Sequence, residues 1–228
     1  MAVVALAVLL VAAVFVRLGF WQLDRLEQRR QRNDVLRARL AEPVAPFAQL
    51  RDTIGYRRAT VVGEPDYERE LVLTGRSRQG SPGVYVATPV RRSGSDTAVV
   101  VIRGWVYAPD AATIDNGQWR ESRTSFSGYV NALPSGNAST STAGSRRLRT
   151  LSFDGVARQL PYPVARLYLV AQDSGTPQSP ARLPPPALNT GPHLSYAIQW
   201  FSFATIVVIG TAVALWHEAR RVRGPSGA

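Results

Sequence analysis

Hydrophobic residues are concentrated in two uncharged stretches, one near each end of the chain. Residues 1–16 carry no charged side chain, and Arg17 is the first charged residue. Extended through RLGFW, the stretch has 21 residues, which as a helix span about 31 Å, the thickness of one bilayer core. A cleaved signal peptide is the rival interpretation, but such a peptide normally begins with basic residues. The pattern therefore predicts an uncleaved transmembrane helix over residues 1–21.

The second stretch covers residues 194–216 and also lacks charge. Tyr196 and Trp200 lie near its start and Trp216 lies at its end, which is how aromatic residues mark the two interfaces of a membrane span. We predict a second transmembrane helix over 194–216, followed by a basic cytoplasmic tail, residues 217–228.

The charges that flank the two predicted spans favour opposite orientations. Arg220, Arg221 and Arg223 follow the second span and indicate a cytoplasmic tail. Arginines also follow the first span and indicate the reverse, but long loops are translocated largely regardless of their charge. We therefore expect the segment between the spans to lie outside the cytoplasm, and we expect a start codon upstream that supplies further basic residues.

The first span is followed by a charged segment, residues 22–42, rich in helix-forming residues with opposite charges close together. We expect this segment to continue the helix until Pro43 and Pro46 end it. Its arginines either form a docking surface for a partner or for anionic lipid, or they are the solvated face of a helix.

Beyond the charged segment, the pattern changes to short runs rich in Val, Thr, Tyr and Leu. Turn residues separate the runs, which is typical of β-strands. The six runs are YRRATVVG, RELVLTG, GVYVATPV, TAVVVIRGWV, SFSGYVNAL and ARLYLVAQ. They predict a compact antiparallel sheet or barrel inside a domain over residues 43–190. The expected fold class is an α+β membrane protein, in which two terminal transmembrane helices bracket an extracytoplasmic β-rich domain.

Two segments of this domain have compositions that do not favour strands. Residues 134–145 are of low complexity, and we expect a disordered loop there. Residues 174–186 are rich in proline, which predicts a stiff linker into the second span.

Composition narrows the possible functions. The chain has no cysteine, which excludes disulfides and thiolate metal sites. The net charge is +11, but the arginines are scattered apart from a group at 25–39. Nucleic-acid binding needs a basic patch with aromatic residues among the arginines, so we expect no nucleic-acid partner. Phosphate-binding loops and nucleophile motifs are missing from the sequence, and we expect the protein not to be an enzyme.

His193 is one of two histidines and lies just before the second predicted span. An imidazole at this boundary can ligate a haem iron, while aromatic residues cover the macrocycle and arginines meet its propionates. The alternative is that His193 caps or hydrogen-bonds the start of the helix. His217 lies within a basic flank and is the weaker ligand candidate.

Three groups of residues together resemble the SURF1 (Shy1) family of cytochrome c oxidase assembly factors, in its bacterial form. The first is RLGFWQLDR, residues 17–25. The second is GVYVATPV with VIRGWVYAPD, residues 83–90 and 101–110. The third is PPPALNTGPHLSYAIQWFSFA, residues 184–204. They occur in the family's order, between its two terminal spans.

The resemblance implies a protein of the cytoplasmic membrane that assists assembly of an aa3-type cytochrome c oxidase. It implies that the protein binds or hands over haem a during maturation of subunit I, with subunit I and haem a synthase as partners. The alternative is a scaffold or accessory subunit that stabilises a subunit I intermediate without binding haem. A two-span sensor or adhesion module is disfavoured, because the tail is too short for a signalling domain.

The resemblance also assigns roles to particular residues. His193 matches the suggested ligand of the haem iron, and Tyr196 and Trp200 in the motif that follows are candidate haem contacts. The candidate partner contacts are Trp21, Gln22, Arg25 and Trp105.

Arg103 interrupts an apolar β-run, and a buried unpaired charge would be costly. Either Arg103 lies at a strand end and reaches solvent or a carboxylate, or it belongs to a rim that grips a haem propionate or a loop of subunit I. We count it among the candidate cofactor-binding residues. The sequence departs from the family pattern at Ile102, where Asn is usual, in the TGP between Asn189 and His193, and in the insertion-like loop 134–145.

Overall fold

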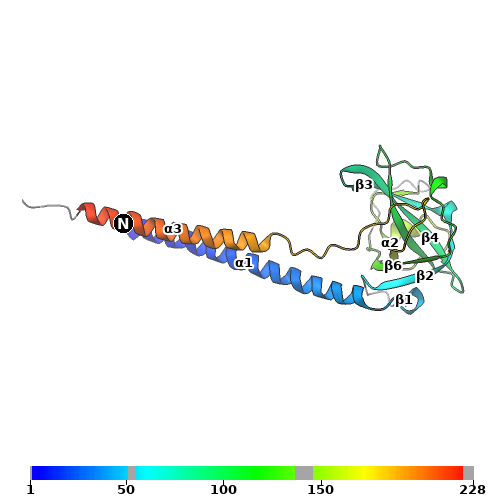
Figure 1. Ribbon diagram of the computed structural model, residues 1–228, viewed down its shortest axis with the longest axis horizontal. Coiled ribbons are helices and arrows are strands. Elements are labelled where there is room, and N and C mark those ends of the chain that lie inside the picture. Colours follow the sequence, from blue (N-terminus) through cyan, green and yellow to red (C-terminus); the bar gives the residue numbers. More distant parts are fainter. Residues whose placement is uncertain (1, 51–54, 137–145, 223–228) are drawn as a thin grey trace, which may run out of the picture. The chain divides into compact units, whose positions relative to one another are not determined.

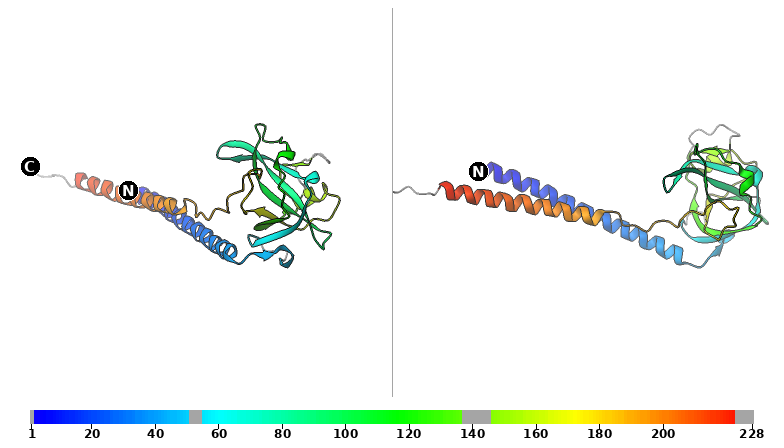
Figure 2. Two further views of the ribbon diagram at one scale, coloured as in Figure 1. Left: turned by 45° about the vertical axis from the view of Figure 1, so that its right-hand side comes forward. Right: turned by 45° about the horizontal axis from the view of Figure 1, so that its top comes forward.

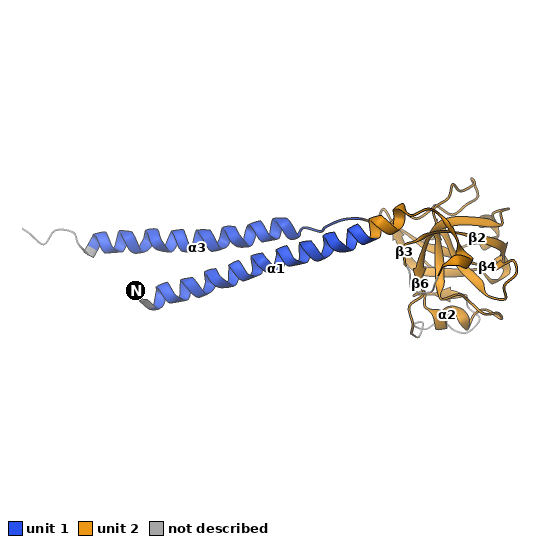
Figure 3. Cartoon of the chain, turned by 90° about the horizontal axis from the view of Figure 1, so that it is seen from below, with its two compact units in different colours: residues 1–35, 188–228 blue, residues 36–187 orange. Residues whose placement is uncertain are grey.

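The computed structural model describes residues 2–50, 55–136 and 146–222. The chain divides into two compact units, residues 1–35 with 188–228 and residues 36–187 (Figure 3). The first unit is a pair of helices, and the second is a β-rich domain.

The helix pair consists of α1 (Ala2–Ala41) and α3 (His193–Val222), which lie side by side and antiparallel (Figure 1). Small residues bring the two helices close together. A Cβ on Gly19 would lie 2.6 Å from the ring of Phe201, so a larger residue there would push this ring aside. Close packing at small residues is a common way for membrane helices to associate.

Both helices are long and apolar enough to cross a membrane, and only 11% and 6% of their apolar windows are buried in the structure. The core helix of a soluble protein would be mostly buried, so this exposed apolar surface suits lipid. The predicted fold class is confirmed: an α+β membrane protein with two terminal transmembrane helices. One continuous helix, α1, contains both the predicted span 1–21 and nearly all of the charged segment 22–42, and it ends before Pro43.

The described part of the domain contains eight strands and one short α-helix. The strands are β1 (Ala45–Pro46), β2 (Arg58–Pro65), β3 (Leu71–Arg78), β4 (Ser81–Arg92), β5 (Ala98–Tyr107), β6 (Ser125–Ala132), β7 (Arg147–Leu148) and β8 (Leu167–Ala171). The helix is α2 (Phe153–Ala157), and 3₁₀ turns occur at Phe47–Gln49, Tyr67–Arg69 and Asn116–Trp119. Each of the six predicted runs overlaps one of the six longer strands.

Five strands close into a small barrel. Neighbouring strands pair in the order β2-β6-β8-β5-β4, and β4 pairs again with β2, which closes the ring. Figure 2 shows the strands of this domain from two further sides. β3 and β7 extend the sheet beyond β4, and β1 extends it beyond β2. Most neighbouring strands are antiparallel, as expected, but β5–β8, β1–β2 and β3–β7 are parallel pairs, so the sheet is mixed. Parallel neighbours need a long connection, and the segment between β5 and β8 provides one.

The barrel interior is filled by apolar side chains from all five ring strands. These include Val61, Val90, Val101, Phe126 and Leu169. A second apolar cluster lies against β3, β4 and β5, where α2 and the residues around it contribute to the packing. Ile102 belongs to this second cluster, which explains why an apolar residue fits at a position where the family usually has Asn.

Of the predicted loop 134–145, residues 137–145 lie outside the described residues. The predicted linker 174–186 does not begin where the sequence indicated. Ala181 pairs with Trp105 of β5, and the carbonyl of Leu183 accepts a hydrogen bond from Gln172 at 2.6 Å. The segment therefore packs on the domain as far as Leu183.

Candidate functional site

A β-bulge in β5 sets the direction of Arg103. Val86 of β4 pairs with Gly104, and the next pair is Ala87 with Ile102, so Arg103 is the extra residue. A bulge turns one side chain out of the regular alternation of the strand. Arg103 thus lies within β5 and has no exposed surface.

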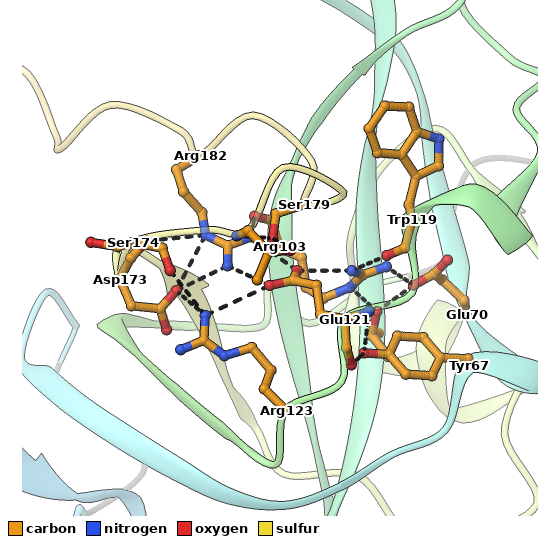
Figure 4. Close-up of polar contacts among 12 residues, drawn as sticks. Tyr67, Glu70, Arg103, Trp119, Glu121, Arg123, Asp173, Ser174, Ser179 and Arg182 are labelled. Atoms are coloured by element: carbon orange, nitrogen blue, oxygen red, sulfur yellow. Dashed lines mark hydrogen bonds and ion pairs between the residues drawn. The ribbon is translucent and has the colours of Figure 1, made fainter.

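All three guanidinium nitrogens of Arg103 donate hydrogen bonds (Figure 4). Nε donates to Oγ1 of Thr88 at 2.7 Å, and Nη2 donates to Oε1 of Glu70 at 2.5 Å. Nη1 donates to the carbonyl of Trp119 at 2.5 Å and to Oε1 of Glu121 at 2.9 Å. The planar guanidinium thereby joins two strands to the two loops that carry the carboxylates.

Further charges extend this arrangement. Arg182 donates two hydrogen bonds to Glu121, from Nη1 to Oε1 at 3.1 Å and from Nη2 to Oε2 at 2.8 Å. Arg182 and Arg123 each lie 3.0 Å from Oδ1 of Asp173. We refer to this set as the ion cluster: Glu70, Arg103, Glu121, Arg123, Asp173 and Arg182. Three arginines face three carboxylates in it, so their formal charges cancel.

The two buried carboxylates of the ion cluster differ in their pKa. Burial alone would raise the pKa of Glu121, but hydrogen bonds from Arg182, Ser179 and Arg103 outweigh it and lower this pKa to about 2. For Glu70 burial prevails and raises the pKa, although Arg103 and Thr88 act against it. Thr88 and Arg103 both donate to Oε1 of Glu70, while Oε2 of Glu70 has no hydrogen-bond partner within the described residues.

This geometry revises the role expected for Arg103. The residue is neither at a strand end nor on a surface rim. It does find carboxylates, but inside the protein. Because its three nitrogens are buried and already donate hydrogen bonds, none of them faces a haem propionate, and we assign Arg103 to the folded core instead of to a cofactor.

The two residues after Arg103 also have packing roles. A Cβ on Gly104 would lie 2.5 Å from the carbonyl oxygen of Ala181, so glycine allows that segment to pair with β5. The ring of Trp105 lies over Gly83, where any side chain would collide with it. Trp105 is partly exposed, so only part of its ring is left for the predicted partner contact.

In the helix pair, His193 is the first residue of α3 and lies opposite Gln22 of α1. Nδ1 of His193 and Oε1 of Gln22 are 2.8 Å apart. An amide oxygen only accepts hydrogen bonds, so Nδ1 carries the hydrogen and Nε2 keeps its lone pair when the ring is neutral. The side chain therefore bonds to the other helix and does not cap the first turn of α3.

The predicted aromatic contacts lie on the same helices. The ring centroid of Trp200 lies 5.6 Å from that of Phe15 on α1 and 5.9 Å from that of Phe203. Trp200 thus helps hold the helix pair together. Tyr196 is 47% exposed and makes no ring contact among the described residues.

Trp21 and Arg25 are exposed on α1. The guanidinium carbon of Arg25 lies 5.5 Å from the centroid of the Trp21 ring. An apolar groove of about 700 Å³ runs beside them, lined by residues of α1 between Ala13 and Asp24. Gln22, which the sequence grouped with Trp21 and Arg25 as a candidate partner contact, is hydrogen-bonded to His193.

Among the described residues, no group of three or more His, Cys, Asp or Glu side chains could hold a metal ion. A metal site made by the protein alone needs several such ligands. A haem brings its own ring nitrogens and needs only an axial imidazole. The lone oriented ring of His193 fits a haem and does not fit a free metal ion.

Comparison with known proteins gives consistent results. Residues 9–205 match the SURF1 family. A SURF1-like protein of Rickettsia felis is 30% identical over 102 residues, 44% of this chain and 45% of that protein. One of Rickettsia bellii is likewise 30% identical over 102 residues, 42% of its length, so these two alignments span less than half of either relative. One of Rickettsia conorii is 23% identical over 207 residues, 86% of this chain and 84% of that protein.

Proposed function

Because the chain belongs to the SURF1 family, we propose that it is an assembly factor for an aa3-type cytochrome c oxidase and binds haem a through His193 during maturation of subunit I. The observation that carries this proposal is the hydrogen bond between His193 and Gln22. It presents one oriented imidazole at the end of a membrane-spanning helix.

Each residue has a limited task in this proposal. Nε2 of His193 would hold the haem iron, and Nδ1 donates to Oε1 of Gln22, which holds the ring in place. When bound, haem a would supply an iron that accepts a nitrogen ligand and an apolar macrocycle that favours the membrane. Trp200 packs on Phe15 and keeps α1 and α3 together close to the ligand.

The position of His193 suits transfer within the membrane. The uncharged run of α3 begins one residue after it. A ligand at this boundary is accessible from the lipid, and its polar side adjoins the headgroups. His193 could therefore receive haem a from one membrane protein, such as haem a synthase, and present it to subunit I without passage through water.

We propose that the domain of residues 36–187 faces away from the cytoplasm. The start of α1 and the end of α3 lie at the same end of the helix pair (Figure 1), and the chain of the domain runs from the end of α1 to the start of α3. Arg220 and Arg221 follow the apolar part of α3, and the guanidinium of Arg220 lies 3.7 Å from the centroid of the Trp216 ring. Arginines in this position are typical of the cytoplasmic side.

A second candidate function is a scaffold that stabilises a subunit I intermediate and binds no haem. The exposed face of α1 favours it, because Trp21 is 48% exposed and lines an apolar groove formed by residues of α1. Haem binding is the property that separates the two candidates.

The test is the visible spectrum of the full-length protein purified in detergent from cells that make haem a. The wild type should carry a haem spectrum. His193→Ala should lose it and still insert into the membrane, because the uncharged run is unchanged. His217→Ala is the matched control and should keep it. A wild-type spectrum and full oxidase activity in His193→Ala would refute the haem proposal and leave the scaffold.

A further inference from the structure

We propose that Gln22 is a positioning residue that prepares His193 as a ligand by fixing the hydrogen of its imidazole on Nδ1. This inference rests on the proposed function, because it concerns the same site. It assigns to Gln22 a role within the chain instead of contact with a partner protein.

The first step is the identity of the accepting atom. The atom of Gln22 that faces Nδ1 is Oε1, a pure acceptor. A neutral imidazole has one N–H, so a hydrogen held on Nδ1 leaves Nε2 as the nitrogen with a free lone pair. Without an acceptor at Nδ1 the ring can place its hydrogen on Nε2, and that form cannot ligate iron through Nε2.

The second step concerns the surroundings of Nε2. Within the described residues Nε2 of His193 makes no hydrogen bond, whereas Nδ1 makes one. Gly191, whose φ is 69°, lies beside the imidazole, and a Cβ on Gly191 would lie 3.4 Å from Nε2 of His193. Glycine therefore leaves open the nitrogen that Gln22 keeps free of hydrogen.

The third step is the rigidity of the arrangement. Nδ2 of Asn33 on α1 donates to the carbonyl of Asn189 at 3.0 Å. The segment that leads into α3 is thus held at two points, at Asn189 by Asn33 and at His193 by Gln22. Asn33 is only 7% exposed, and Leu26 between them is only 5% exposed. The imidazole is held by the helix pair before any ligand arrives, which lowers the entropic cost of binding.

The experiment compares three variants of the full chain in detergent. Gln22→Leu removes the acceptor and keeps a side chain of similar size, whereas Gln22→Glu keeps an acceptor at the same place. Gln31→Leu is the control, because Gln31 is an exposed glutamine on the same helix. Haem a is titrated into each protein and its dissociation constant is measured by visible absorption. In the haem-free proteins, ¹⁵N NMR of the histidine side chains reports which nitrogen carries the hydrogen.

We expect Gln22→Leu to bind haem a about 10- to 100-fold more weakly, as for other residues that orient metal-bound histidines. Its haem-free NMR spectrum should lose the Nδ1–H form. Gln22→Glu and Gln31→Leu should retain both properties. If the wild type bound haem a and Gln22→Leu bound it with the same affinity and kept the same tautomer, the inference would be overturned and the proposed function would stand. Failure of the wild type itself to bind haem a would overturn the proposed function, and the role of Gln22 with it.

Discussion

Nη2 of Arg103 lies 2.5 Å from Oε1 of Glu70, and neither side chain is more than 1% exposed. Burial of two charges is costly, and their attraction offsets the cost only while both partners are present. The pair is therefore a point at which a single substitution should damage the fold of the domain, with no direct effect on the helix pair.

We predict that Arg103→Ala destabilises the protein by about 3–5 kcal/mol, because it leaves Glu70 and Glu121 buried without their shared arginine. A loss of this size is a large share of the stability of an ordinary domain, so the variant should also accumulate poorly in cells. Denaturant unfolding of the full chain in detergent, followed by tryptophan fluorescence, measures the change.

Arg91→Ala is the control for this substitution. Its partner is Glu64 at 2.8 Å, and the two side chains are 53% and 74% exposed. An exposed ion pair contributes at most about 1 kcal/mol. Equal losses in the two variants would contradict the assignment of Arg103 to the core. Normal abundance of Arg103→Ala with reduced oxidase would restore the functional interpretation.

The depressed pKa of Glu121 predicts how stability depends on pH. A carboxylate whose pKa falls from 4.5 to about 2 on folding stabilises the folded state above its unfolded pKa. That stabilisation, roughly 3 kcal/mol, is lost as the pH falls from about 4.5 towards 2. The raised pKa of Glu70 acts in the opposite sense, so the two contributions must be separated by substitution.

Glu121→Gln separates them. The variant should be less stable than the wild type at pH 7, and the difference should shrink as the pH is lowered from 4.5 towards 2. The measurement is the denaturant midpoint of both proteins at several pH values. A difference that stays constant over this range would show that the carboxylate of Glu121 does not titrate as its surroundings require.

The extent to which the sequence predicts this structure depends on whether a feature is local. The six longer strands follow from runs such as SFSGYVNA in β6, where apolar residues alternate into the barrel. Both spans follow from uncharged runs alone. The parallel pairing of β5 with β8 does not follow, because no local pattern says which strands become neighbours.

The ion cluster and the His193 contact are non-local in the same way. Arg103 is 33 residues from Glu70 and 79 from Arg182. Gln22 is 171 residues from His193. The sequence made Arg103, Gln22 and His193 candidates one by one, and only the fold shows the partner of each. Gly191 had one available signal, a glycine just before the candidate ligand, and its positive φ became visible only in the structure.

A topology prediction uses the absence of native cysteine. Ser93→Cys places one thiol at an exposed position after β4. We expect it to react with a membrane-impermeant maleimide in intact bacterial spheroplasts, because the domain is proposed to face outward. Glu218→Cys, at the opposite end of the helix pair, should react only after lysis. The reverse pattern would place the domain in the cytoplasm.

The last prediction concerns Gly191. Gly191→Ala adds a Cβ 3.4 Å from Nε2 and 3.3 Å from Cδ2 of His193. The methyl group should crowd the nitrogen proposed to bind iron, and we expect haem a affinity to fall about tenfold, which corresponds to roughly 1.4 kcal/mol. The hydrogen on Nδ1 should remain, because the bond to Gln22 is untouched. Absorption titration and ¹⁵N NMR measure the two properties separately.

Alanine is also strained at Gly191, since its φ is 69°, and strain alone could weaken binding. Gly94→Ala controls for this effect. Its φ is 73°, and a Cβ there meets nothing within 4 Å. Both variants should lose similar stability, but only Gly191→Ala should lose haem affinity. If both bound haem a as the wild type does, the open space beside Nε2 that Gly191 leaves would not be needed for binding, and the prediction for Gly191 would be wrong.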